Sequence, residues 1–138
     1  MISEKGKFSY MTNFGNIKLI KYYCELIIAI HQKHQQNFQD FCQNVEYQYA
    51  ISMGLIQIGE LANKLTGDFK EYFPDIQWYQ IKSFRNRLAH QYGSIDVDLT
   101  YLISTNDIVE LDKQLAKIIS DFEKEYPDVI DNQKNENL

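Results

Sequence analysis

Residues 50–65 read AISMGLIQIGELANKL, and this stretch decides the fold. Its apolar side chains recur at steps of three and four residues, the spacing that places them on one face of an α-helix. The Thr66-Gly67 pair that follows favours a helix end, because glycine is common just past helix C-termini. Gly54 and Gly59 each weaken a helix by about 1 kcal/mol relative to alanine. We therefore predict a helix that its neighbours approach closely at these two glycines.

Three other stretches repeat the helical period. The first runs from Asn16 to about His34, and the second begins near Asp75 or Ile76 and carries the apolar residues Trp78, Ile81, Phe84 and Leu88. The third begins at Asn106 or Asp107 and ends before Pro127. A connector or short helix is expected over residues 35–44, and another short helix over about 97–104.

These elements predict an all-α protein, an up-and-down bundle of four to five helices. Two prolines and six glycines are too few for the frequent turns of a β-rich chain. The chain of 138 residues has room for one domain. We expect a loose leader over residues 1–15, the helical domain over 16–126 and a disordered tail over 127–138.

Several classes of protein are disfavoured by what the sequence lacks. It has neither a stretch of about 18 apolar residues nor a signal-peptide pattern, so we expect a soluble, cytoplasmic protein without membrane contact. Cys24 and Cys42 are too few for a disulfide framework or a zinc site, and packing roles are expected for both. His31 and His34 lack a third ligand at helical spacing, so we interpret them as solvated-face residues and expect no metal site.

Positive charge is concentrated in one short segment. Residues 77–92 carry Lys82, Arg85 and Arg87 with no acid, whereas residues 93–138 carry four lysines against eleven acids. Both arginines of the chain lie within five residues of His90, in RNRLAHQY (85–92). A guanidinium offers a planar fork to phosphate, so this segment is the candidate site.

Arg85 and His90 have the chemistry that phosphodiester cleavage needs. A histidine exchanges protons near neutral pH, and an arginine stabilises charge on the phosphate oxygens. With RNA, the 2′-hydroxyl would be the nucleophile, and the product a 2′,3′-cyclic phosphate. The two side chains are about 140° apart around a regular helix, so a distorted last turn or a second copy of the chain would be needed to unite them. The alternative is that both merely stabilise the helix end.

The segment from Glu46 to about Ile119 resembles the HepT family of HEPN proteins. The resemblance rests on IQIGELANKL, on PDIQW and on the motif Arg-x4-His-x-Tyr, which Arg85, His90 and Tyr92 match. It implies a HEPN-type helical homodimer and a ribonuclease toxin of a toxin–antitoxin system, with Arg85 and His90 as the catalytic pair and no cofactor.

The resemblance also implies a partner, an antitoxin of the MntA type. Such a nucleotidyltransferase would use ATP and magnesium to transfer AMP to the motif tyrosine, here Tyr92. An adenylyl group near His90 would repel RNA phosphates and fill the site. Among supporting residues, Asn86 would bond a phosphate or hold Arg85, while Arg87 and Lys82 would contact RNA.

Two other interpretations remain open at the level of sequence. In the first, the chain is a non-catalytic HEPN subunit that docks a minimal nucleotidyltransferase and positions its substrate. In the second, it is a purely structural dimer, which leaves the focused positive segment unexplained. We expect Glu60 either to pair with Arg85 across the bundle or to lie exposed, and we expect Asp96 to cap the segment that follows it.

Overall fold

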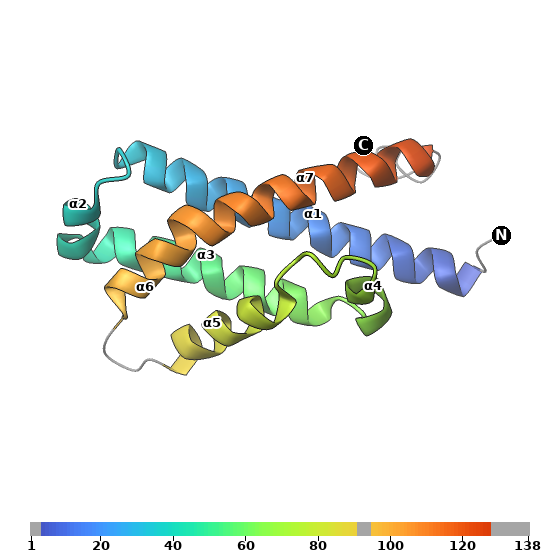
Figure 1. Ribbon diagram of the computed structural model, residues 1–138, viewed down its shortest axis with the longest axis horizontal. Helices are drawn as coiled ribbons and strands as arrows, with labels where there is room; N and C mark the ends of the chain where they lie inside the picture. The colour runs from blue at the N-terminus through green and yellow to red at the C-terminus, as the bar shows by residue number, and fades with distance from the viewer. Residues whose placement is uncertain (1–3, 91–94, 128–138) are drawn as a thin grey trace.

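The structure, a computed structural model, describes residues 4–90 and 95–127, with side chains described from Met11 onward. Within these ranges the body of the molecule is made of the long helices α1 (Glu4–Lys33), α3 (Val45–Lys64), α5 (Trp78–His90) and α7 (Ile108–Glu125). Successive long helices run in opposite directions along the bundle (Figure 1). The expected all-α, up-and-down HEPN-type bundle is confirmed.

Shorter elements connect the long helices. Helix α2 (Phe38–Gln43) lies at one end of the bundle, and α4 (Gly67–Glu71) lies toward the other (Figure 1). Helix α6 (Val97–Leu102) continues directly into the π-helical turn η1 (Ile103–Asp107) and then into α7. Helix α7 begins at Ile108 with Asp107 at its N-cap position, which agrees with the expected start, but Asp107 makes no side-chain cap hydrogen bond because the helical conformation continues from η1.

Short polar side chains fix where several helices begin, because their oxygens accept hydrogen bonds from otherwise unpaired N–H groups. Asn44 accepts from the Tyr47 N–H at 3.1 Å at the start of α3. Asp96 accepts from the Leu99 N–H at 3.1 Å at the start of α6, which confirms its predicted role. Thr66 is the N-cap of α4, so the Thr66-Gly67 pair begins a helix as well as following one.

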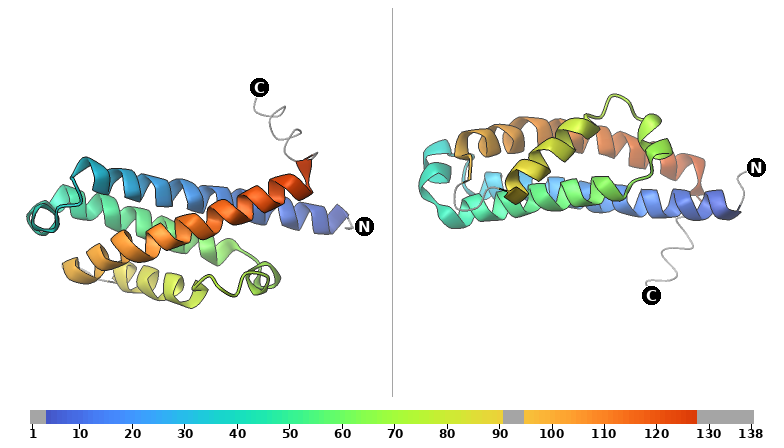
Figure 2. Two further views of the ribbon diagram at one scale, coloured as in Figure 1. Left: turned by 45° about the horizontal axis from the view of Figure 1, so that its top comes forward. Right: turned by 90° about the horizontal axis from the view of Figure 1, so that it is seen from below.

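Helix α3 is central to the packing: it contacts α1 and α5, and α1 in turn contacts α7. In the right view of Figure 2, α1 and α3 form one layer, and α5 and α7 form the other. Gly54 of α3 faces Ile27 of α1, and Gly59 faces Arg85 of α5, so both predicted close approaches are confirmed. The fully buried centre comprises apolar residues from three of the long helices and α2: Ile17, Ile20, Ile27, Phe41, Ile51, Leu55, Ile58 and Leu115.

The N-terminal region differs from the expected loose leader. Helix α1 begins at Glu4 rather than at Asn16, and Asn13 and Phe14 are buried. The Asn13 amide donates to Thr66 Oγ1 at 3.0 Å and accepts from the Thr66 N–H at 3.1 Å. Phe14 stacks on Phe122 of α7, with 4.0 Å between ring centroids. These contacts connect the first turns of α1 to the rest of the bundle, whereas residues 128–138 of the predicted tail lie outside the described residues.

Candidate active site

Helix α5 carries the positive segment and is anchored at both its start and its inner face. The indole Nε1 of Trp78 donates to the carbonyl oxygens of Lys70 at 3.2 Å and Phe73 at 3.1 Å, which connects the first residue of α5 to α4 and the loop after it. Ile81 and Phe84 are buried against the core. The opposite side of α5 is therefore open to solvent.

Arg85 is held by Glu60 of α3. Its Nε donates to Glu60 Oε1 at 3.0 Å, and its Nη2 donates to the same oxygen. The side chain of Arg85 is 25% exposed and that of Glu60 is 43% exposed, so the pair lies at the edge of the bundle in reach of solvent. The sequence left two alternatives for Glu60, and the one in which it pairs with Arg85 across the bundle is confirmed.

A glycine makes this ion pair possible. A Cβ atom on Gly59 would lie 2.2 Å from Arg85 Cβ and 2.4 Å from its Cγ, a distance that no pair of non-bonded carbons tolerates. The stem of Arg85 thus crosses α3 directly over Gly59, and its guanidinium reaches the next residue, Glu60. Glycine directly before Glu60 therefore has a steric reason: a larger residue at position 59 would block the path of the Arg85 side chain.

Asn86 completes the support of Arg85. The Nη1 of Arg85 donates to Asn86 Oδ1 at 2.9 Å, so of the two roles expected for Asn86, holding Arg85 is the one observed. Nη1 and Nη2 each carry a second hydrogen. Neither of these hydrogens is needed for the contacts with Glu60 and Asn86. Arg85 therefore keeps donors for an anion while its guanidinium plane is fixed by two neighbours.

His90 is the last residue of α5, and its side chain is exposed. Because α5 is α-helical through His90, the distorted last turn considered from the sequence is not observed up to this residue. Arg85 and His90 thus project about 140° apart around one helix. Arg87 and Lys82 are exposed, and neither forms an ion pair within 4–90 and 95–127. Tyr92 lies outside the described residues.

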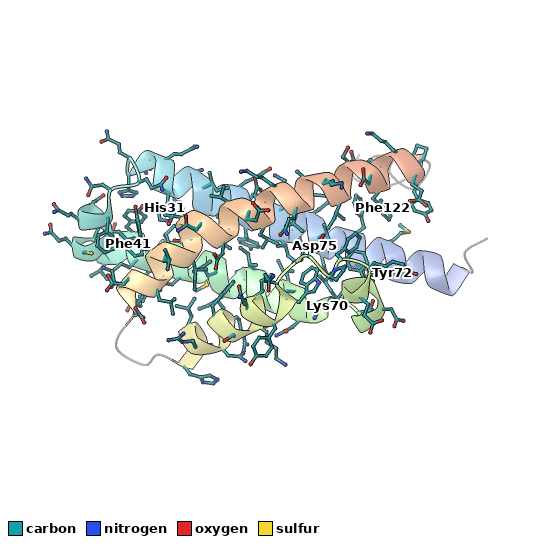
Figure 3. All side chains as sticks on the ribbon, in the orientation of Figure 1. His31, Phe41, Lys70, Tyr72, Asp75 and Phe122 are labelled. Carbon is teal, nitrogen blue, oxygen red and sulfur yellow. The ribbon has the colours of Figure 1, made fainter. Side chains whose placement is uncertain are left out.

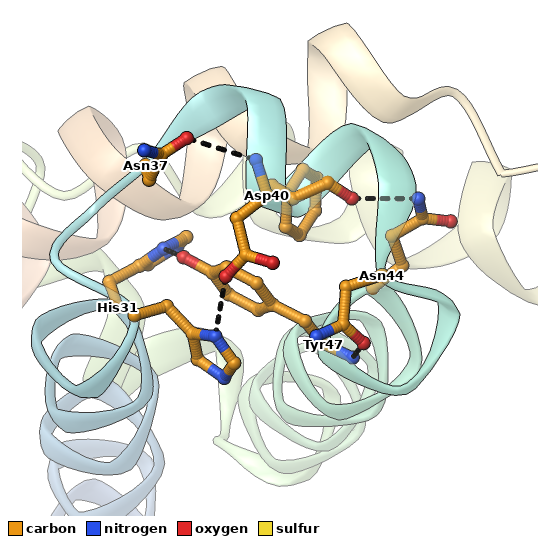
Figure 4. Close-up of polar contacts among 8 residues, drawn as sticks. His31, Asn37, Asp40, Asn44 and Tyr47 are labelled. Atoms are coloured by element: carbon orange, nitrogen blue, oxygen red, sulfur yellow. Dashed lines mark hydrogen bonds and ion pairs between the residues drawn. The ribbon is translucent and has the colours of Figure 1, made fainter.

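A second polar cluster was not predicted, and His31 is its centre. We expected this histidine on a solvated face, but it is buried, with 4% of its surface exposed. Its Nε2 lies 2.8 Å from Ser104 Oγ, and its Nδ1 contacts the hydroxyl of Tyr47 (Figure 4). Ser104 donates to the Tyr101 carbonyl at 3.1 Å, so it must accept from His31 Nε2–H, and Nδ1 accepts from Tyr47.

His34 also differs from a freely solvated residue. Its ring stacks on Tyr47 with 4.0 Å between centroids, and its Nδ1 lies 2.8 Å from Asp40 Oδ2 of α2. The cluster lies at the α2 end of the bundle, where Figure 3 labels His31 and Phe41. The pKa of His31 is lowered to about 4, mainly because the ring is buried and secondly because His34 lies nearby and repels a positive charge on it. His31 is thus neutral at neutral pH and connects α1 to η1.

The described part of the chain contains no group of three or more potential metal-ligating side chains.

Cys24 is buried and Cys42 is exposed, so the expected packing role applies to the first thiol and is wrong for the second. Across residues 4–90 and 95–127, none of the helices combines the length and apolar character that crossing a membrane requires.

Comparison with known proteins identifies the family to which this chain is similar. The model of the family described as "Ribonuclease HepT-like" matches residues 14–118. A protein of Methanocaldococcus jannaschii, provisionally named as an RNase, is 31% identical over 88 residues, which cover 64% of this chain and 76% of that protein. A protein of Thermococcus cleftensis named "probable ribonuclease HepT" is 31% identical over 81 residues, or 59% of this chain and 74% of the relative. No solved structure gave a significant match.

The matched region includes all of α3 and α5, and with them Glu60, Arg85 and His90. The match begins at Phe14, within the part of α1 for which the sequence predicts a loose leader. On the extent of this match, the chain belongs to the HepT-like ribonuclease family.

Proposed function

We propose that this protein is an endoribonuclease toxin whose catalytic residues are Arg85 and His90. The observation that carries the proposal is the support of Arg85: Glu60 and Asn86 fix its guanidinium at the bundle edge while N–H donors remain for a phosphate. A preorganised cation is what a reaction that builds charge on phosphate oxygens requires. The substrate is RNA, in keeping with the family and with the acid-free segment 77–92.

The cleavage step needs only groups that the chain and the RNA supply. The 2′-oxygen attacks the adjacent phosphorus, a new P–O2′ bond forms and the P–O5′ bond breaks. One histidine accepts the 2′-hydroxyl proton, and a proton is delivered to the departing 5′-oxygen. Arg85 donates to the non-bridging oxygens as their charge grows. The products are a 2′,3′-cyclic phosphate and a 5′-hydroxyl, and no metal or cofactor takes part.

The separation of Arg85 and His90 around α5 supports a second copy of the chain in the active unit. Since one regular helix directs them about 140° apart, a single copy does not face one phosphate with both groups. In a two-fold homodimer that pairs the α5 helices, two arginines and two histidines would share one cleft. One histidine would then act as base and the other as acid.

The regulator that we propose is a nucleotidyltransferase antitoxin of the MntA type, acting on Tyr92. The phenolic oxygen attacks the α-phosphorus of ATP, pyrophosphate leaves, and the phenolic proton is released. ATP and magnesium belong to the partner. The attached AMP brings negative charge to a position two residues after His90, so RNA phosphates would be repelled from the site.

The test is the intact mass of the protein purified with and without the nucleotidyltransferase, together with an RNA-cleavage assay of both samples. We expect an added AMP mass on Tyr92 and cleavage only by the unmodified sample. Neither mass change nor cleavage from folded protein would favour the alternative, a non-catalytic HEPN subunit that docks the nucleotidyltransferase.

A further inference from the structure

A cavity of about 250 Å³ lies beside α5, between this helix and the α6–η1 segment. Phe84, Leu99 and Ile103 provide apolar surface. The polar residues around it come from both walls: Gln80, Ser83 and Arg87 from α5, and Asp107 from η1. A cavity with apolar surface and a few polar groups is the usual form of a small-ligand site.

The cavity lies on the same side of α5 as His90. Seven residues separate Ser83 from His90, which is almost two full helical turns, so their side chains leave the helix in nearly the same direction. Arg87 lies one turn before His90 and lines the cavity as well. Arg85 instead projects toward Glu60 of α3. A ligand in the cavity would therefore lie on the His90 side of α5, one helical turn from His90 at Arg87 and about two turns from it at Ser83.

Arg87 and Asp107 keep their charged groups available to a ligand, as far as residues 4–90 and 95–127 are concerned: neither side chain forms an ion pair within these ranges. Asp107 precedes α7 but gives no side-chain cap to it. Both are exposed, so their charges face solvent at the rim of the cavity. The rim thus offers one fork of N–H donors and one pair of carboxylate acceptors.

The wall formed by η1 is fixed from behind. Ile103 and Asp107 are the first and last residues of this π-helical turn, in which the Ile108 N–H donates to the Ile103 carbonyl. Ser104 of the same turn is buried and bonded to His31 at 2.8 Å. π-Helical turns are rare and often occur at functional sites. The turn presents Asp107 to the cavity while its other side is held in the core.

We infer that this cavity binds one nucleobase of the RNA substrate beside the cleaved phosphate, and that the base is guanine. Guanine offers the acceptors O6 and N7, which an arginine fork such as Arg87 recognises. It also offers adjacent N1–H and N2–H donors, which match the two oxygens of the Asp107 carboxylate. The base would lie against Phe84, Leu99 and Ile103. Asp107 and Arg87 are thus specificity-determining residues; the inference rests on the proposed ribonuclease function.

The test compares cleavage of RNA oligonucleotides that differ only in the base next to the cleaved bond. Wild type is expected to prefer guanine about tenfold, the discrimination of one good bidentate contact. Asp107→Asn should reduce this preference to about twofold and keep cleavage of the other oligonucleotides, because an amide offers one acceptor where the carboxylate offers two. Asp98→Asn removes the same charge from an exposed position on α6 that does not line the cavity, and it should retain the wild-type preference.

Binding of guanosine monophosphate and uridine monophosphate, measured by calorimetry on the same proteins, separates this inference from the proposed function. Cleavage that needs His90 but shows the same base profile in Asp107→Asn and Asp98→Asn would overturn the guanine site and leave the ribonuclease intact. Guanosine monophosphate that binds wild type more tightly than Asp107→Asn, without any RNA cleavage, would support the site and contradict the ribonuclease. Equal binding of the two nucleotides by wild type would overturn the site in either case.

Discussion

Glu60 on α3 accepts hydrogen bonds from both Nε and Nη2 of Arg85 on α5 through a single carboxylate oxygen. With Asn86 on Nη1, this contact determines the plane of the guanidinium. The pair is partly exposed, so it contributes little to stability, on the order of 1 kcal/mol or less. We interpret it as a device that positions Arg85 rather than one that stabilises the bundle.

Glu60→Ala is expected to slow RNA cleavage about tenfold, because a free Arg85 side chain no longer meets the phosphate in one geometry. Glu60→Gln keeps an oxygen acceptor and should recover most of the wild-type rate. The measurement is the cleavage rate of both variants, with circular dichroism to show that each is folded. Equal losses in the two variants would point to the charge of Glu60 instead of its position.

Gly59→Ala is expected to destabilise the protein by about 1–3 kcal/mol, the usual cost of forcing extra volume into a packed contact. The new methyl group would meet Arg85 Cβ at 2.2 Å, so α5 must move away from α3. Urea unfolding measures the change. Gly15→Ala in α1 is the matched control, since nothing lies within 4 Å of its added carbon, and it should stabilise by about 0.5–1 kcal/mol. A neutral Gly59→Ala would show that the two helices are not in contact here.

Stability is expected to fall as the pH is lowered from about 6.5 to about 4 because of His31. Its folded pKa lies below the unfolded value of 6.5, so in this window the unfolded state binds more protons than the folded state. The free energy of unfolding is therefore higher above pH 6.5 than below pH 4, and the neutral state of His31 accounts for about 3 kcal/mol of this difference. His31→Gln cannot titrate, so its urea midpoint should change less between pH 7 and pH 5. Parallel pH profiles for the two proteins would rule out His31 as the cause.

Tyr92→Phe is expected to leave RNA cleavage intact and to remove the proposed control of cleavage by a nucleotidyltransferase. Phenylalanine lacks the oxygen that would accept AMP. Growth of cells that express the variant with the nucleotidyltransferase should be arrested, whereas wild type with the same partner should grow. Tyr79→Phe, at an exposed tyrosine of α5, serves as the control. If cells that express Tyr92→Phe with the nucleotidyltransferase grew as well as those with wild type, the modification would lie on another residue or would not be needed.

The sequence was sufficient for the features that depend on local pattern. The helical period of 50–65 predicted α3, and the cost of glycine inside it predicted the contacts at Gly54 and Gly59. Asp96, whose place after the motif resembles that of the family's acid, is confirmed as a cap, and short acidic side chains accept from backbone N–H groups at helix starts. In each case one residue and its neighbours along the chain carry the physical reason.

Features that depend on tertiary contacts were missed. His31 has the polarity of a surface residue, and only Tyr47 and Ser104, which are distant in sequence, make its burial favourable. Residues 1–15 show no sustained helical period, so the sequence predicts a leader there, and the burial of Asn13 depends on Thr66, which is far along the chain. Asn106 and Asp107 predict the start of the last helix, but the sequence gives no sign that both belong to a π-helical turn that joins α6 to α7.

The most direct test of the central claim is the rate at which the purified protein cleaves RNA, compared with His90→Ala and Arg85→Ala. Both positions are at the bundle edge, so both variants should fold, as circular dichroism would verify. We expect cleavage by wild type, a loss of about 100-fold or more in each variant, and products that end in a 2′,3′-cyclic phosphate. Cleavage by folded His90→Ala at the wild-type rate would contradict the account.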